Sequence, residues 1–224
     1  MDKLLTVVIP SYNVEKFLNQ TLDSFVCDEA VMKKFEVIVV DDGSKDNTAK
    51  IGKEYADKYP DTFRVISKEN GGHGSTINCG IRNAVGKYFK VVDGDDWVNT
   101  ADFVKLVEDL EKTESEYVFT NYYEYYDDVN RQKAVDFPQF KDGTEYDFAD
   151  VANKVYIPMH ALVIKTSVLK DNNIVIDEKC FYVDVEYVMF PVPFVNKVTF
   201  FDLHVYMYRL ALSTQSVSIL GFQK

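Results

Sequence analysis

The chain has 224 residues, of which 46% are hydrophobic and 27% charged, an ordinary composition for a globular protein with a sizeable core. Its 36 acidic residues against 25 Lys and Arg give a formal net charge of -11. Such a surface repels nucleic acid on average, so nucleic acid is not an expected partner. An anionic ligand would need local neutralisation, for which a bound divalent cation is the obvious agent.

Cysteine usage and the distribution of apolar residues point to the cytoplasm. Cys27, Cys79 and Cys180 are far apart, odd in number and form no CxxC, which argues against a zinc site and a disulfide framework. No signal peptide is visible at the N-terminus, and no apolar stretch approaches the ~20 residues that cross a bilayer. We therefore expect a cytoplasmic protein with reduced thiols, free to associate peripherally with the inner face of the membrane.

The first hundred residues alternate strand and helix signals. Runs rich in β-branched residues predict strands buried on both faces at residues 4–9, 36–40, 63–67 and 88–92. Apolar residues at helical spacing predict helices over 14–26 after an Asn13 cap, from 46 or 47 to about 58, around 77–85 with Gly86 as the C-cap, and over 102–113. This order predicts an α/β fold with a mostly parallel sheet and helices on both faces.

The second half is less regular. A tyrosine-rich strand is predicted at 117–126, a polar stretch with turn residues at 127–143, helices at 145–155 and 184–190, and a strand or hairpin at 198–209. We expect one continuous domain over residues 1–224, with a division near residue 100.

Polar loops follow all four predicted parallel strands. They cover residues 10–13, 41–44, 69–74 and 93–97. Ligands of open parallel sheets bind at the carboxyl ends of the strands. The gathering of acidic and glycine-rich loops at one sheet edge therefore predicts a binding site.

The most specific of these loops carries Asp93, Asp95 and Asp96 within four residues. Carboxylates so close raise one another's pKa unless a cation neutralises them. Hard oxygen ligands of this kind suit Mg²⁺ or Mn²⁺, which also bridge diphosphate oxygens. The alternative is a turn with an acidic helix N-terminus. The position directly after a buried strand favours a metal.

Two of the other three loops are open to two interpretations each. Asp41 and Asp42 precede Gly43. Either they belong to a turn that leads into the next helix, or one of them also provides a carboxylate that accepts hydrogen bonds from a base or ribose. Residues 70–74 are either a flexible loop or a set of backbone N–H groups open to an anion. His73 is interpreted as a polar loop residue rather than a metal ligand.

Together, the four motifs resemble those of family 2 glycosyltransferases, which have the GT-A fold. They are IPSYN (9–13), VVDDGSKD (39–46), ENGG (69–72) and VDGDDW (92–97), in the family's order and spacing. The resemblance implies an inverting transfer of a sugar from a nucleotide-sugar, usually a UDP-sugar, to a hydroxyl of a carbohydrate or glycoconjugate, with Mn²⁺ or Mg²⁺, as in polysaccharide synthesis. It also implies a nucleotide-sugar half over 1–100 and an acceptor half over 101–224.

The resemblance carries roles over to individual residues. Pro10 and Tyr12 would pack around the base and Asp42 would accept its N–H. Asp93 would hold ribose or sugar hydroxyls and Asp95 the metal that bridges the diphosphate. The other expected donor contacts are Asp41, Asn70, Gly71 and Gly94. Asp93 is also expected to be the second metal ligand. One departure matters: Ile77 stands where many relatives have an Arg.

In the second half the resemblance assigns the general base to Asp184. The family has an acidic pair opening a helix there, and Val183 replaces its first member. A carboxylate in line can take the proton of the attacking hydroxyl. The alternatives are a helix N-cap for Asp184 and Glu186 as the base. Arg209 and residues 213–216 resemble a closing segment, which we expect to order over the diphosphate together with a loop at residues 73–74.

Three other functions are alternatives to this one: a non-catalytic carbohydrate-binding relative, a metal-dependent nucleotidyltransferase or phosphotransferase, and a response-regulator receiver. The last has its acidic pair after the first strand, whereas this chain has it after the second. The tyrosines of the predicted strand at 117–126 either stack on a sugar or are half-buried strand residues, and the second interpretation is favoured for at least two of them. They are Tyr122, Tyr123, Tyr125 and Tyr126.

Overall fold

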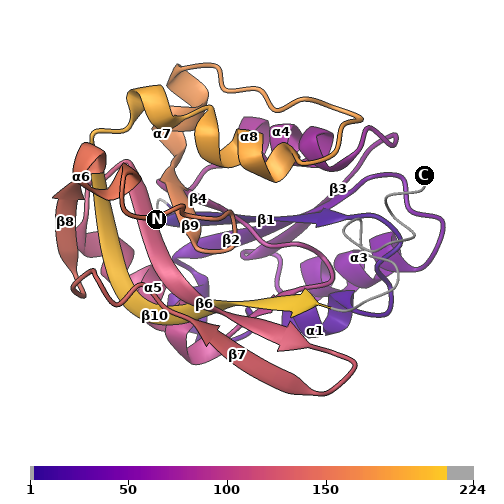
Figure 1. Ribbon diagram of the computed structural model, residues 1–224. Helices are drawn as coiled ribbons and strands as arrows, with labels where there is room; N and C mark the ends of the chain where they lie inside the picture. Colours follow the sequence, from indigo (N-terminus) through magenta and orange to yellow (C-terminus); the bar gives the residue numbers. More distant parts are fainter. Residues whose placement is uncertain (1–2, 211–224) are drawn as a thin grey trace.

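The computed structural model describes residues 3–210 and contains one ten-stranded sheet between layers of helices (Figure 1). The strands are β1 (Leu5–Ser11), β2 (Phe35–Asp41), β3 (Phe63–Ser67), β4 (Tyr88–Val91), β5 (Trp97–Val98), β6 (Tyr117–Tyr126), β7 (Arg131–Val135), β8 (Thr144–Asp147), β9 (Leu162–Lys165) and β10 (Lys197–Leu210). The helices are α1 (Leu18–Asp23), α2 (Glu29–Met32), α3 (Thr48–Lys58), α4 (His73–Asn83), α5 (Thr100–Asp109), α6 (Phe148–Ala152), α7 (Thr166–Asp171) and α8 (Val183–Met189), with short 3₁₀ turns η1 (Leu110–Lys112) and η2 (Val192–Phe194).

The sheet has a parallel half and a mixed half. Its order is β3-β2-β1-β4-β9-β6-β10-β5, with β7 beside β6 and β8 beside β10. The first four strands in this order are parallel, as predicted. Beyond them, β9 runs antiparallel to β4 and β6, β10 runs parallel to β6, and β5 and β8 are antiparallel to β10. The expected α/β fold, a mostly parallel sheet with a less regular second half, is thus confirmed.

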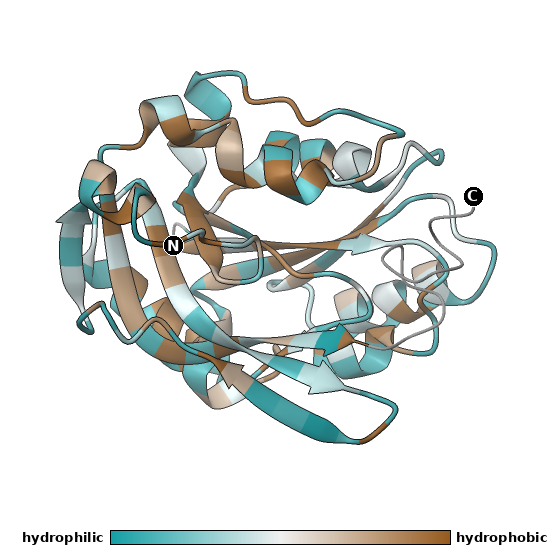
Figure 2. Ribbon diagram, in the orientation of Figure 1, coloured by the Kyte–Doolittle hydropathy of each residue, from teal (hydrophilic) through white to brown (hydrophobic). Residues whose placement is uncertain are grey.

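Successive side chains of β1 and β2 point to opposite sides of the sheet. Both faces of the parallel half are buried, because helices cover each of them. Val8 and Ile38 face the core cluster that contains residues of α4, α7 and α8. Val7 and Val37 face the cluster that contains residues of α1 and α5. The two helix layers lie above and below the sheet in Figure 1, and Figure 2 shows the strands between them to be largely hydrophobic.

Several predicted elements differ from the observed ones. Asn13 does not cap a helix: its backbone is left-handed (φ 54), its side chain accepts a hydrogen bond from Lys45 N, and α1 begins only at Leu18. Gly86 is not the C-cap of α4, which is Ala84. A Cβ at Gly86 would lie 2.4 Å from Thr6 N, so a close approach to β1 requires the glycine.

In the second half, tertiary pairing changes the predicted elements further. The predicted helix over 145–155 begins as strand β8 and is helical only over α6. The polar stretch contains β7, and β9 and α7 were not predicted. Cys27, Cys79 and Cys180 are free thiols, as expected. Within residues 3–210, no helix has the length and apolar character needed to span a bilayer.

Candidate active site

The loops after β1, β2 and β4 are joined by backbone hydrogen bonds at the carboxyl ends of these strands. Asp42 N donates to Ser11 O (2.8 Å), and Gly94 N donates to Pro10 O (3.1 Å). A Cβ at Gly94 would lie 2.9 Å from Pro10 O, so only glycine allows this approach. Tyr12 extends from the same edge with 49% of its surface exposed. The structure therefore brings together four of the predicted donor-binding residues.

Asp96 anchors the acidic turn to β10. Its side chain is 2% exposed; Oδ2 accepts from the Tyr206 hydroxyl (2.6 Å) and Oδ1 from Arg209 N (2.7 Å). Asp93 N in turn donates to the Tyr206 hydroxyl (3.1 Å). Burial raises the pKa of Asp96, and the charges of Asp95 and Asp93 raise it further. Both oxygens of Asp96 thus hold the turn in place.

Asp93 and Asp95 present the reactive carboxylates of this turn. Asp93 Oδ1 accepts from His73 Nε2 at 2.8 Å. Burial opposes a charged His73, but the charge of Asp93 and this hydrogen bond outweigh it and raise the pKa of His73. Asp95 accepts no hydrogen bond from another described side chain, and burial, followed by the charge of Asp93, raises its pKa to about 6. The repulsion between neighbouring carboxylates that the sequence predicted is therefore present at Asp95.

A second group of ligand atoms overlaps this one. Single ligand atoms of Asp93, Asp96 and His160 lie within 4.8 Å of one another. The His160 ring stacks on Tyr208 with centroids 3.9 Å apart, and burial lowers its pKa to about 4, so the imidazole is neutral at neutral pH. Sequence reasoning missed His160 because it lies in an irregular segment with no motif around it.

The Asp42 carboxylate is fully engaged within the chain. Oδ1 accepts from Lys68 Nζ (2.6 Å) and Gly71 N (3.0 Å), and Oδ2 accepts from Gly72 N (2.8 Å). The Asn70 side chain donates to Asp42 O (3.0 Å). Asp42 thereby clamps the glycine-rich loop, and a base N–H would have to share Oδ2 with Gly72 N. The carboxylate of the neighbouring Asp41 accepts a hydrogen bond only from Ser44 N (3.0 Å) among the described residues.

The glycine-rich loop is packed against the second half of the chain. A loop was expected at His73 and Gly74. These residues instead form the first turn of α4. A Cβ at Gly74 would lie 2.0 Å from Asp177 O, and Lys179 N donates to Gly71 O (2.9 Å). This contact surface holds residues 71–74 in place. Ile77, in the position of the family's Arg, is fully buried in the core.

Asp184 lies in the first turn of α8, close to the acidic turn. The N-cap of α8 is Tyr182, so Asp184 is not the helix cap. Its charge acts on His73 and Tyr208, both of which also feel Asp93 and Asp95. The rival base Glu186 accepts a hydrogen bond from Asp177 N (2.8 Å) and so holds the preceding segment. Of the two acids, only Asp184 is among the charges that act on His73 and Tyr208.

Arg209 supports the acidic turn from behind. It is 5% exposed; Nε donates to Asp95 O (2.8 Å), Nη2 donates to Gln20 Oε1 (2.6 Å), and Nη1 pairs with Asp127. The guanidinium carbon also lies 4.6 Å from the Trp97 ring centroid. The contact of Arg209 with a diphosphate, which the resemblance implies, stays a prediction. Residues 213–216 of the expected closing segment lie outside the described residues.

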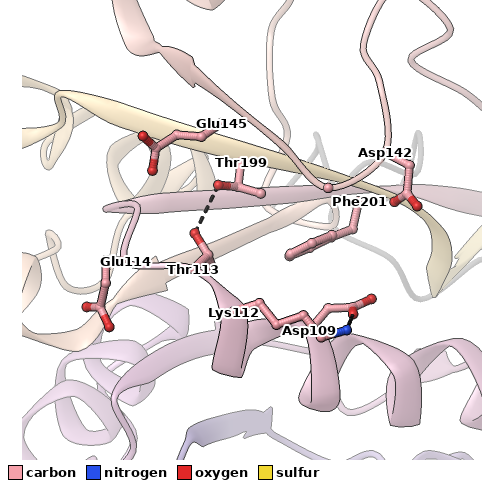
Figure 3. A pocket seen from close by; sticks show the side chains of 9 residues that line it. Asp109, Lys112, Thr113, Glu114, Asp142, Glu145, Thr199 and Phe201 are labelled. Carbon is pink, nitrogen blue, oxygen red and sulfur yellow. Dashed lines mark hydrogen bonds and ion pairs between the residues drawn. The ribbon is translucent and has the colours of Figure 1, made fainter.

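A cavity of about 310 Å³ lies elsewhere, beside η1, β8 and the start of β10 (Figure 3). Four carboxylates line it, but the Asp109 carboxylate is paired with Lys112 (2.6 Å), and the Thr113 and Thr199 hydroxyls bond to each other (3.0 Å). Tyr206 and Arg209, which hold the acidic turn, lie near the other end of β10. None of the predicted site residues lines this cavity, so it is separate from the candidate active site.

Known proteins resemble the chain in both sequence and structure. It is 37% identical over 123 residues to the uncharacterized glycosyltransferase EpsJ of Bacillus subtilis, a match that covers 55% of this chain and 35% of that protein. It is 33% identical over 111 residues to the minor teichoic acid biosynthesis protein GgaB of the same organism, covering 50% of this chain and 12% of GgaB. The chain therefore matches only a part of these relatives' length.

Among solved structures, S. aureus TarS in complex with UDP-GlcNAc superimposes with a TM-score of 0.77 at 24% identity, covering 93% of this chain and 59% of that one. The mannosyltransferase PcManGT from Pyrobaculum calidifontis, in complex with GDP-Man and Mn²⁺, superimposes with a TM-score of 0.66 at 18% identity, covering 92% and 57%. These likenesses establish the GT-A fold. Residues 6–172 match glycosyl transferase family 2, a span of more than half of the chain. The chain therefore belongs to the family 2 glycosyltransferases.

Proposed function

We propose that this glycosyltransferase moves a sugar from a UDP-sugar to a hydroxyl of a carbohydrate or glycoconjugate, with inversion at the anomeric carbon. The observation that carries the proposal is the placement of Asp184, from the second half of the chain, within electrostatic range of the acidic turn after β4. TarS was solved with UDP and with UDP-GlcNAc, which supports a uridine donor. The cytoplasmic location and the donor and acceptor halves divided near residue 100 stay predictions.

The residues of the acidic turn fit a divalent cation. Asp95 carries a carboxylate without a hydrogen-bond partner among the described side chains and a pKa raised to about 6, and Asp93 has one oxygen beyond its bond to His73. Hard, crowded oxygen ligands favour Mg²⁺ or Mn²⁺. In this proposal Asp95 and Asp93 hold the ion, with His160 as a neighbouring ligand candidate. When bound, such an ion offsets the charge that develops on the departing nucleotide diphosphate.

The donor would lie along the edge formed by the first two strand ends and the glycine-rich loop. Tyr12, which is half exposed, offers its ring to the base beside Pro10. Asp41 has a carboxylate oxygen without a partner in the described chain, so it offers an acceptor beside that of Asp42. Asp42, Asn70 and Gly71 then shape the edge through their mutual hydrogen bonds, and Gly94 lets the acidic turn approach Pro10 closely.

Asp184 serves as the general base in this proposal. It takes the proton of the acceptor hydroxyl as that oxygen attacks the anomeric carbon. A single in-line displacement of this kind inverts the configuration at that carbon. Asp184 is suited to the role because it accepts no hydrogen bond from the described chain, whereas Glu186 is engaged by Asp177 N.

The test is a panel of nucleotide-sugars assayed for release of the nucleotide diphosphate, with and without Mn²⁺, together with thermal stabilisation by UDP. We expect metal-dependent release of UDP from at least one UDP-sugar and stabilisation by UDP that grows with Mn²⁺. Stabilisation by UDP without release from any donor would favour a non-catalytic binding protein. Release of pyrophosphate from a nucleoside triphosphate, with transfer of the nucleoside monophosphate to an acceptor, would favour a nucleotidyltransferase instead.

A further inference from the structure

The three carboxylates of the turn after β4 differ in how many of their oxygens are engaged. Asp96 uses both of its oxygens to bind β10. Asp95 accepts no hydrogen bond from another described side chain. Asp93 lies between these extremes, because only its Oδ1 is engaged, by His73 Nε2 at 2.8 Å. Within residues 3–210, His73 is therefore the one side chain that fixes the Asp93 carboxylate.

The segment that carries His73 is bonded to acids on both sides of β1. Asp42, after β2, accepts hydrogen bonds from Gly71 N (3.0 Å) and Gly72 N (2.8 Å), and the next residue, His73, reaches Asp93 after β4. In the sheet, β1 lies between β2 and β4. Three consecutive residues thus connect the two acidic turns through hydrogen bonds.

Packing fixes the backbone from which the imidazole extends. Gly72 is the N-cap of α4 and has a positive φ of 84°, which glycine adopts without strain. His73 begins the helix, and its carbonyl accepts from the Thr76 hydroxyl (2.6 Å). A Cβ at Gly74 would lie 2.0 Å from Asp177 O, so the first turn of α4 packs tightly against the segment before α8. The imidazole therefore extends from a fixed backbone rather than from a flexible loop.

The hydrogen bond restricts what Asp93 can offer to a ligand. An Asp carboxylate turns readily about its last side-chain torsion and so offers either oxygen, or both, to a partner. With Oδ1 held by His73, that rotation is restrained, and Oδ2 accepts no hydrogen bond from the described chain. The two side chains are 33% and 26% exposed, so the pair is open to solvent. Hydrogen-bonded partners of metal ligands orient them in this way and tune their affinity for the metal.

We propose that His73 is a positioning residue, which holds Oδ1 of Asp93 so that this carboxylate offers only Oδ2 to the divalent cation. The inference rests on the proposed function, in which Asp93 and Asp95 hold the ion. The imidazole acts through Asp93 and is not itself a ligand, because its Nε2 is bonded to the carboxylate. A residue that the sequence analysis interpreted only as polar thereby acquires a specific task in the site.

Binding of Mn²⁺ to the full chain in the presence of UDP tests this role without any turnover. Electron paramagnetic resonance of Mn²⁺ gives both the fraction of bound ion and a spectrum that depends on its coordination. The variants are His73→Gln, whose amide nitrogen donates in place of Nε2, and His73→Phe, which keeps a ring and removes the donor. The matched control is His204→Phe, because His204 Nε2 also bonds to a carboxylate, Asp136 Oδ1 (2.6 Å), which lies outside the acidic turn.

We expect His73→Phe to weaken Mn²⁺ binding roughly ten- to hundredfold, the usual cost of removing the hydrogen-bonded partner of a metal ligand. His73→Gln should stay within about threefold of the wild type because it keeps the donor, and His204→Phe should be unchanged. Wild-type affinity in His73→Phe would overturn the proposal. A loss in His73→Gln or in His204→Phe as large as that in His73→Phe would overturn it as well. If His73→Phe does not fold, His73→Leu takes its place.

Release of UDP from UDP-sugars keeps this inference and the proposed function apart. In His73→Phe, release should be slow at low Mn²⁺ and return close to the wild-type rate at saturating Mn²⁺, because the carboxylate is misplaced rather than lost. A rate that saturating Mn²⁺ does not restore would overturn the positioning role.

The two measurements together separate the possible failures. If the wild type releases UDP from no donor while His73→Phe weakens Mn²⁺ binding, the proposed function fails and the positioning role stands. If UDP is released in a Mn²⁺-dependent way but His73→Phe binds Mn²⁺ as the wild type does, the proposed function stands and the positioning role fails. A wild type that binds no Mn²⁺ would also overturn the positioning role.

Discussion

Two acidic turns follow β2 and β4, the strands on either side of β1, and their carboxylates differ in hydrogen bonding. After β2, Asp42 is saturated by Lys68, Gly71 and Gly72. After β4, Asp95 has no hydrogen-bond partner among the described side chains, and burial raises its pKa to about 6. A saturated carboxylate fixes the backbone around it, whereas an unneutralised one favours a cation. The comparison shows that acidic residues at a strand end become a ligand site only where the rest of the fold withholds partners from them.

The partners come from different parts of the chain. The turn after β2 meets the next loop of the parallel half, whose N–H groups point at it. The turn after β4 meets β10, and there Asp96 takes the Tyr206 hydroxyl and Arg209 N. Asp96 thus accepts these hydrogen bonds, while the Asp95 carboxylate interacts with the charge of Asp93.

The largest expected effect is at the unsaturated turn. Asp95→Asn should remove the Mn²⁺-dependent part of UDP affinity, roughly a hundredfold or more, because a neutral amide cannot replace the charge of the ligand. Calorimetry of UDP with and without Mn²⁺ measures it. Asp109→Asn, which changes an acid in the remote cavity, is the matched control. Unchanged affinity in Asp95→Asn would show that the turn does not hold the metal.

The next effect is on turnover. Asp184→Asn should keep donor affinity and lose about 10²–10⁴ in rate, the usual cost of removing a positioned general base. Glu186→Gln should retain most of the rate, because Glu186 is engaged by Asp177 N. Turnover and UDP affinity of both variants are measured side by side. Near-normal turnover in the first with collapse in the second would move the base to Glu186.

The saturated turn should respond through stability. Asp42→Ala leaves the N–H groups of Gly71 and Gly72 and the Lys68 ammonium without their carboxylate, and should lower the free energy of unfolding by about 2–4 kcal/mol. Urea denaturation of this variant beside Asp95→Asn tests the contrast, since the latter breaks no hydrogen bond within the described chain. Unaltered stability, with a loss of affinity for UDP but not for a ribose diphosphate that lacks the base, would show that Asp42 recognises the base.

The smallest effect concerns the link between the second turn and β10. Tyr206→Phe removes the hydroxyl that serves Asp96 and Asp93 N, and should lower the free energy of unfolding by about 1–2 kcal/mol. It should also weaken Mn²⁺-dependent UDP binding. The control is Tyr88→Phe, which deletes another buried hydroxyl, bonded to Thr113 O (2.9 Å), away from the turn. Equal UDP affinity in both variants would separate Asp96 from the positioning of Asp93 and Asp95.

Local sequence was sufficient for the parallel half of the fold. β3 spans the predicted residues, and β1, β2 and β4 differ from theirs by one or two residues, because unbroken apolar runs bounded by polar loops leave few alternatives. The resemblance of the motifs to family 2 glycosyltransferases was confirmed as well. In contrast, β8 and β9 depend on pairing with strands far along the chain, which no local period reveals.

The sequence by itself determined the order of the elements, the edge of the sheet where polar loops gather, and the presence of a crowded acidic turn at that edge. The tertiary structure alone decided which carboxylates stay unpaired, since hydrogen-bond donors reach them from β10, α4 and the glycine-rich loop. It also brought His160 and Tyr208 to the acidic turn. The physical reason is that burial and partnering are properties of a surrounding volume, whereas the sequence specifies only neighbours along the chain.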